Sequence, residues 1–131
     1  MKYLLDTNIC IYLLNNRPKS VRENFKRYQI ADVGISSVTV SELAFGVAKN
    51  RSVKNRASLE SFLLPLNIAP YDVDAAMVYG EIRATLEAQG KTIGPLDMLI
   101  AAHALSLGAV LVTNNEKEFK RVSKLKVENW L

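Results

Sequence analysis

The chain has 131 residues, of which 49% are hydrophobic and 23% are charged, and its formal net charge is +4. This composition excludes an intrinsically disordered protein, and no apolar run approaches the ~20 residues that a membrane-spanning helix needs. The N-terminus shows no signal segment and Cys10 is the only cysteine, so we expect a cytoplasmic protein with no membrane partner, in which Cys10 packs in the core.

The first predicted strand, residues 2–5, is a short apolar run that stops at a carboxylate, Asp6. Thr7 or Asn8 is expected to cap the amphipathic helix that follows. A polar segment should end this helix, and Pro18 is well placed to open a second one.

A second short strand is predicted at residues 33–35. The two serines that follow it are expected to cap a helix whose apolar residues recur at the spacing of one helical face, so Glu42 falls in its first turns. A basic linker over residues 49–56 leads into another helix. Pro70 then marks residues 67–71 as an edge strand, because proline cannot donate a hydrogen bond to a neighbouring strand.

Residues 73–88 are predicted to form a longer helix whose inward face includes Thr85. A Gly-Pro pair opens the next helix, with Asp97 in its first turn and a long apolar stripe behind it. Residues 109–112 form the clearest buried strand of the chain, and residues 127–130 are expected to add a last one.

Strands that alternate with helices predict an α/β fold, a three-layer α/β/α sandwich with a mostly parallel central sheet, in one domain over residues 1–131. Ligands of such sheets bind beyond the carboxyl ends of the strands. Four acidic residues follow predicted strands or begin a helix, and we expect them to meet at this edge: Asp6, Glu42, Asp97 and Glu118. Three of them have apolar neighbours in the sequence, unlike ordinary surface charges.

Bringing these carboxylates together has an electrostatic cost. Two charges ~4 Å apart repel by ~4 kcal/mol at an effective dielectric of about 20. Bound cations would remove this repulsion, and an all-oxygen ligand set suits Mg²⁺ or Mn²⁺ rather than zinc. A pair of such ions can activate water and stabilise the departing oxygen of a phosphodiester. Asn8 and Thr113 are placed to orient the carboxylates or their bound waters.

Each acidic residue also has an explanation that needs no metal. Asp6 could cap the helix after it, and Glu42 could complete a capping box with the threonine three residues before it. Asp97 could be a favourable charge in a first helical turn, and Glu118 could pair with the arginine three residues after it. His103 lies on the apolar stripe of its helix and is interpreted as a buried structural histidine.

Most of the 17 Lys and Arg residues fall into three clusters, at residues 17–27, 49–56 and 117–126. Such clusters are often solvated helix faces. Placed around an acidic site, they would instead suit a polyanion whose phosphates they contact while metal ions act on it.

Four motifs resemble those of PIN-domain ribonucleases, and most closely those of the VapC toxins of bacterial toxin–antitoxin pairs. They are LLDTN at residues 4–8, SSVTVSEL at 36–43, IGPLD at 93–97, and VTNN at 112–115 followed by EF at 118–119. The four occur in the order of that family, and the resemblance runs from residue 2 to Trp130, which is essentially the whole chain.

The resemblance implies a PIN-like fold and a Mg²⁺- or Mn²⁺-dependent endoribonuclease in which Asp6, Glu42, Asp97 and Glu118 are the catalytic and metal-binding acids. It also implies a homodimer and a small VapB-type antitoxin, which inserts a segment into the acidic groove and provides the only link to DNA. Relatives with a similar Gly-Pro stretch cleave initiator tRNA in its anticodon stem-loop, so this tRNA is the expected substrate. Asn115 stands where many members have an aspartate, which leaves Glu118 as the fourth acid, acting on the metal through water.

Three other functions are weighed against this one. A haloacid-dehalogenase-type phosphatase also has an aspartate after its first strand, but it requires a second aspartate where this chain has Asn8. A response-regulator receiver needs an acidic pair near Asp6 and a lysine at the end of a late strand, where this chain has Thr113. A non-catalytic nucleic-acid-binding module would explain the basic clusters, but not carboxylates in apolar surroundings.

Overall fold

The computed structural model describes residues 1–15, 19–51 and 53–131. At its centre is a five-stranded sheet in the order β3-β2-β1-β4-β5, in which all neighbouring strands are parallel. The strands are β1 (Tyr3–Leu5), β2 (Val33–Ser36), β3 (Asn67–Ala69), β4 (Val110–Val112) and β5 (Val127–Glu128). Each of the five predicted strands is present, and β3 is an edge strand as expected.

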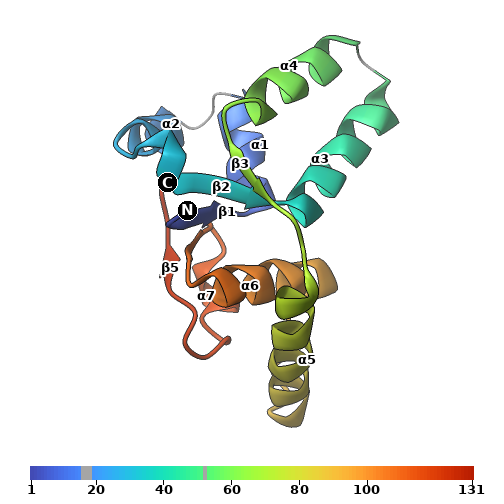
Figure 1. Ribbon diagram of the computed structural model, residues 1–131, viewed down its shortest axis with the longest axis vertical. Coiled ribbons are helices and arrows are strands. Elements are labelled where there is room, and N and C mark those ends of the chain that lie inside the picture. Colours follow the sequence, from blue (N-terminus) through green and yellow to red (C-terminus); the bar gives the residue numbers. More distant parts are fainter. Residues whose placement is uncertain (16–18, 52) are drawn as a thin grey trace.

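Helices cover both faces of this sheet (Figure 1). One face carries α1 (Thr7–Asn15), α2 (Lys19–Lys26), α3 (Ser37–Asn50) and α4 (Val53–Leu63). The other carries α5 (Val73–Ala88), α6 (Pro95–Leu107) and α7 (Glu116–Phe119), and a short 3₁₀ helix, η1 (Ile30–Asp32), precedes β2. Figure 1 shows α3 and α4 projecting together from one side of the molecule, while α5 extends in the opposite direction.

The alternation of side chains along the strands builds the two cores. Leu4 and Leu111 belong to the apolar core beneath α5 and α6, whereas Leu5 and Val112 belong to the core shared with α1, α3 and α4. Successive side chains of a strand point to opposite faces, so each short strand contributes to both cores. The predicted three-layer α/β/α sandwich is therefore confirmed.

Some local predictions are wrong. β3 ends at Ala69, so Pro70 lies just outside the strand, and β5 ends at Glu128. Thr85 is exposed, because α5 buries residues spaced seven and four apart, and Thr85 lies off that stripe. These errors concern the ends and the faces of elements rather than their presence.

Three further predictions concern the helix start at Pro18, the packing of Cys10 and the absence of a membrane-spanning helix. The expected helix start at Pro18 falls on residues 16–18, outside the described part of the chain. Cys10 is fully buried, and burial raises the pKa of its thiol well above the usual value, as expected for a packing residue. Within the described ranges, no helix combines the length and the apolar character needed to cross a bilayer.

Candidate active site

The order of the strands creates a switch point beside β1. The chain passes from β1 to β2 and β3 on one side, and then returns to β4 and β5 on the other. In open α/β sheets, ligands bind beyond the carboxyl ends of the strands at such a point. Asp6 directly follows β1 and Thr113 directly follows β4, and the backbone N–H of Asp6 donates to the carbonyl of Val112 at 2.9 Å. The predicted position of Asp6 at a strand end is confirmed.

The Asp6 side chain is held from both oxygens. Oδ1 accepts the backbone N–H of Ile9 at 2.9 Å, and Oδ2 accepts the hydroxyl of Thr113. Thr113 Oγ1 in turn accepts the backbone N–H of Asn115 at 3.0 Å. Asp6 therefore caps α1 itself, and the expectation that Thr7 or Asn8 would do so is wrong.

Burial raises the pKa of Asp6, whose side chain is only 6% exposed. The hydrogen bonds from Thr113 and Ile9 act in the opposite direction, and the negative charge of Glu42 raises the pKa further. The carboxylate is thus oriented by neutral donors but keeps an electrostatic cost that a cation would relieve.

A cavity of about 560 Å³ opens between α1, α3 and α6, and Asp6, Glu42 and Asp97 all line it. The remaining residues of its wall are Thr7, Asn8, Ile11, Val38, Ser41, Phe45, Leu96 and Ile100. A smaller cavity of about 260 Å³ between α1, α3 and α4 also includes Glu42, but neither aspartate. We refer to the larger cavity as the acidic pocket. Three of the four predicted acids meet in it, whereas Glu118 is not part of its wall.

Glu42 reaches the acidic pocket from α3. Ser36 caps this helix as predicted, because its hydroxyl accepts the backbone N–H of Val38 at 3.0 Å. Thr39 is consequently the third residue of the helix, and a capping box between Thr39 and Glu42 is ruled out. Glu42 instead accepts a hydrogen bond from Thr7 Oγ1 at 2.8 Å, which ties α3 to the start of α1.

Asp97 lies in the first turn of α6, where Pro95 opens the helix. Burial raises the pKa of Asp97 to about 6, together with the negative charges of Glu118, Asp6 and Glu42. This shift is an electrostatic sign that all four predicted acids act on one region, although they are far apart in the sequence.

Glu118 contacts the start of α6 rather than the acidic pocket. Its Oε1 accepts the backbone N–H of Gly94 at 3.2 Å, and its Oε2 accepts the side-chain amide of Asn115. The alternative pairing with Arg121 is not among the ion pairs of the described residues, and Arg121 donates instead to the carbonyl of Thr92 at 3.0 Å. Glu118 therefore links the turn after β4 to the helix that carries Asp97.

In their observed positions, no three Asp, Glu, His or Cys side chains of the described residues are close enough to bind one ion together. The chemistry of the pocket still fits a divalent cation. Its charged groups are carboxylates only, which suits Mg²⁺ or Mn²⁺. Burial raises the pKa of Asp97 most, and the other carboxylates, which face it without a counter-charge, raise it further.

Comparison with known proteins identifies the family. Residues 3–125 match the PIN domain. The "tRNA(fMet)-specific endonuclease VapC" of Shigella flexneri is 46% identical over 99% of this chain and 98% of its own length. The chain belongs to the PIN-domain family and, within it, to the VapC proteins.

Solved VapC-containing structures have the same architecture. The DNA-bound VapBC of Salmonella typhimurium contains a chain that is 41% identical, with a TM-score of 0.92 over 100% of this chain and 99% of that one. The VapBC2 of Rickettsia felis, bound to a DNA fragment from its promoter, gives 42% identity and a TM-score of 0.89 over 100% of both chains. PIN-domain ribonucleases generally depend on divalent metal ions. Because the chain belongs to the VapC proteins, the phosphatase and receiver alternatives are not supported.

Three residues of the acidic pocket were not predicted from the sequence as parts of a site. Thr7 bonds Glu42, but its position suggested only a helix cap. Phe45 lines the acidic pocket, and its place three residues after Glu42 on one helical face could have indicated this. Leu96 also lines the pocket, and it lies at the very start of α6, just before Asp97.

His103 is buried as expected, and its ring connects α6 to the start of α3. Its Nδ1 lies 2.8 Å from the hydroxyl of Ser36, the residue that caps α3. Burial lowers the pKa of His103, while Asp72 and a hydrogen bond to the backbone of Pro70 raise it. Because the backbone of proline offers only a carbonyl, the His103 ring donates the bond to Pro70.

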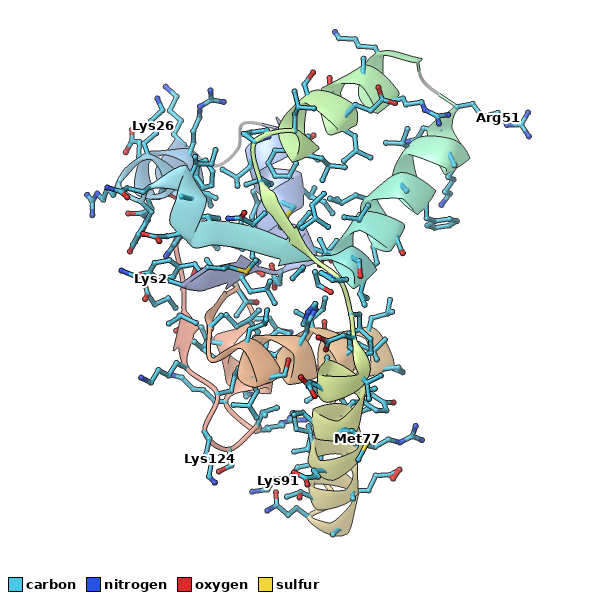
Figure 2. The ribbon with its side chains drawn as sticks, viewed as in Figure 1. Lys2, Lys26, Arg51, Met77, Lys91 and Lys124 are labelled. Carbon is cyan, nitrogen blue, oxygen red and sulfur yellow. The ribbon has the colours of Figure 1, made fainter. Side chains whose placement is uncertain are left out.

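The basic clusters do not line the acidic pocket. Lys26, Arg51 and Lys124, one member of each cluster, lie at three separate corners of the molecule (Figure 2). None of the described residues in the wall of the pocket is Lys or Arg. The described residues of the basic clusters therefore contribute no side chain to the wall of the acidic pocket, and their contact with a polyanion stays a prediction.

Proposed function

We propose that this VapC-family chain is the ribonuclease toxin of a toxin–antitoxin pair and that it cleaves tRNA(fMet) in the anticodon stem-loop. One observation carries the proposal. The acidic pocket brings Asp6, Glu42 and Asp97 together at the switch point of the sheet, in a chain that is 46% identical to a tRNA(fMet)-specific endonuclease over 99% of its length.

In this proposal Asp6, Glu42 and Asp97 hold Mg²⁺ or Mn²⁺ in the acidic pocket. A bound ion of this type supplies a Lewis acid that activates water and stabilises charge on a departing phosphodiester oxygen. Thr113 keeps Asp6 in its orientation through the bond to Oδ2, and Thr7 does the same for Glu42.

Glu118 and Asn115 complete the site from the side of α7. Glu118 is proposed to fix the start of α6 through Gly94 and to act on the metal through water, since its oxygens already accept two protein hydrogen bonds. Asn115 orients Glu118, and Asn8, which lines the pocket with an exposed side chain, is available to position a metal-bound water.

The assembly follows from the same family. We propose that residues 1–131 form one PIN domain, which acts in the cytoplasm as a homodimer and is inhibited by a VapB-type antitoxin. The related VapBC structures from Salmonella typhimurium and Rickettsia felis are bound to DNA. Contact of this chain with DNA is proposed to occur only through the antitoxin.

The proposal is tested by incubating the purified chain with total tRNA and Mg²⁺ and mapping the new RNA ends. A single cut in the anticodon stem-loop of tRNA(fMet) is expected. Asp6→Asn and Asp97→Asn should each lower the rate by about 100-fold or more, because loss of a metal ligand should exceed the ~10–100-fold effect of an outer-shell substitution.

Asp74→Asn is the matched control, because Asp74 is also an acid in the first turn of a helix but is exposed on α5. Full activity in both pocket variants would refute the assignment of the site. Absence of any cut, together with no rise in the Tm on addition of Mn²⁺, would favour the non-catalytic nucleic-acid-binding module instead.

A further inference from the structure

Among the described residues, three large apolar side chains are exposed in the wall of the acidic pocket, and Ile11 on α1 is the least exposed of them at 39%. Phe45 on α3 is 68% exposed, and Leu96 at the start of α6 is 46% exposed. Single exposed apolar residues are normal on a protein surface. These three side chains come from three different helices and share a wall with the carboxylates, so the pocket combines negative charge with accessible apolar surface.

The described residues of this wall provide no positive charge for a phosphate group, since none of them is Lys or Arg. A bound divalent ion would attract the reacting phosphate, but the neighbouring nucleotides gain nothing from the carboxylates beside it. Contacts to those nucleotides near the reaction centre must therefore be made mainly by uncharged groups. The bases of an RNA loop suit such contacts, because they are unpaired and stack readily on aromatic side chains.

The ring of Phe45 has a suitable position for this role. Phe45 follows Glu42 by three residues on α3, so their Cβ atoms are about 5–6 Å apart on one helical face. Stacked nucleotides are spaced by about 3.4 Å along one strand. A base that is one or two nucleotides away from the phosphate reacting beside Glu42 is thus within reach of the Phe45 ring.

We propose that Phe45 forms a base-stacking subsite of the acidic pocket, on which an unpaired nucleobase beside the cleaved phosphodiester rests, with Leu96 as a second apolar contact. The inference depends on the ribonuclease function proposed above and adds a substrate-binding residue to it. An apolar side chain of a protein partner is the competing occupant. RNA is favoured because the ring lies one helical turn from a carboxylate assigned to the cleavage chemistry.

The test uses a stem-loop RNA that the native chain cleaves, with the cut already mapped. KM and kcat are measured for the native chain and for Phe45→Leu, Phe45→Trp and Leu64→Ala. Phe45→Leu should raise KM by about 5- to 150-fold, which converts to ~1–3 kcal/mol of lost stacking, with a smaller change in kcat. Phe45→Trp should stay near the native KM. Leu64, which is 87% exposed and lines none of the pockets described above, is the matched control for loss of an exposed apolar side chain.

A second substrate separates stacking from general apolar contact. It carries abasic sites at the nucleotides that flank the cut. The native chain should lose affinity for the abasic RNA by a factor similar to that caused by Phe45→Leu, and the Leu variant should show no further loss. Independent losses from the substitution and the abasic sites would overturn the subsite, as would a native KM for Phe45→Leu.

Two other outcomes are distinguishable. Weaker inhibition of Phe45→Leu by the cognate antitoxin, with an unchanged KM, would assign the ring to the protein partner and overturn the subsite. Failure of the native chain to cleave RNA would refute the ribonuclease function itself, and this is seen before any Phe45 variant is compared.

Discussion

The two aspartates of the acidic pocket are held in different ways. Asp6 leaves the sheet at the end of β1, is almost fully buried, and accepts hydrogen bonds at both oxygens. Asp97 lies at the start of α6, is half-buried, and has its pKa raised to about 6 by burial and by the other three acids. The end of β1 thus orients one acid through neutral donors, whereas the pKa of the other is raised first by burial and then by the neighbouring acids.

The largest effect is expected for a substitution that removes the hydrogen bond from Thr113 to Asp6. Thr113→Val keeps the branched shape but leaves Asp6 Oδ2 without its donor and the backbone N–H of Asn115 without its acceptor. We expect RNA cleavage to fall about 10- to 100-fold. The free energy of unfolding should fall by about 1–3 kcal/mol, because the loss occurs in a buried network. Cleavage rates and urea unfolding measure the two effects.

Thr85→Val serves as the control for the Thr113 variant, since Thr85 is an exposed threonine on α5. Its effect on unfolding should be within about 0.5 kcal/mol. Unchanged activity in Thr113→Val would show that the protein does not need the Thr113 hydroxyl to orient Asp6.

The second prediction concerns the raised pKa of Asp97. Because the folded pKa of Asp97 is about 6 and its ordinary value is 3.8, the folded chain binds a proton more tightly than the unfolded chain. The contribution of Asp97 to stability is therefore present below about pH 4 and is lost as the pH rises to about 6. Asp97→Asn removes the ionisable carboxyl group and, with it, this loss of stability at higher pH. Without divalent ions, the variant should become more stable than the native chain above pH 6, by about 1–2 kcal/mol after allowance for solvent screening.

Urea unfolding in EDTA between pH 4 and pH 8 tests this pH dependence. The difference between Asp97→Asn and the native chain should grow up to about pH 6 and then stay constant. Asp74→Asn, in the first turn of α5, should show no such growth. A difference that is independent of pH would mean that the pKa of Asp97 is not raised in the folded chain.

The position of Asp6 can be predicted from the sequence more readily than the contacts that Asp6 and the other pocket residues make. Asp6 and Thr113 each follow a buried apolar run, so both strand ends are visible locally. The bond between them joins residues 107 apart, and periodicity cannot specify such a pair. Glu42 was open to a capping-box interpretation because the threonine before it fits that pattern, but Ser36 caps the helix. Leu96 lies on the apolar stripe of α6, yet it occurs where the helix starts, at the mouth of the pocket.

The smallest predicted effect concerns how α6 is held relative to α3. Ser36 caps α3 through Val38 and also contacts the buried His103 of α6, so one hydroxyl connects the helices that carry Glu42 and Asp97. Ser36→Ala should lower the free energy of unfolding by about 1 kcal/mol, the typical loss for a helix cap. Ser61→Ala, on the exposed surface of α4, is the control and should be nearly neutral. If the connection also sets the separation of Glu42 and Asp97, the pH-dependent gain from Asp97→Asn should change in the Ser36→Ala background. Strict additivity of the two substitutions would show instead that packing of α6 alone places Asp97.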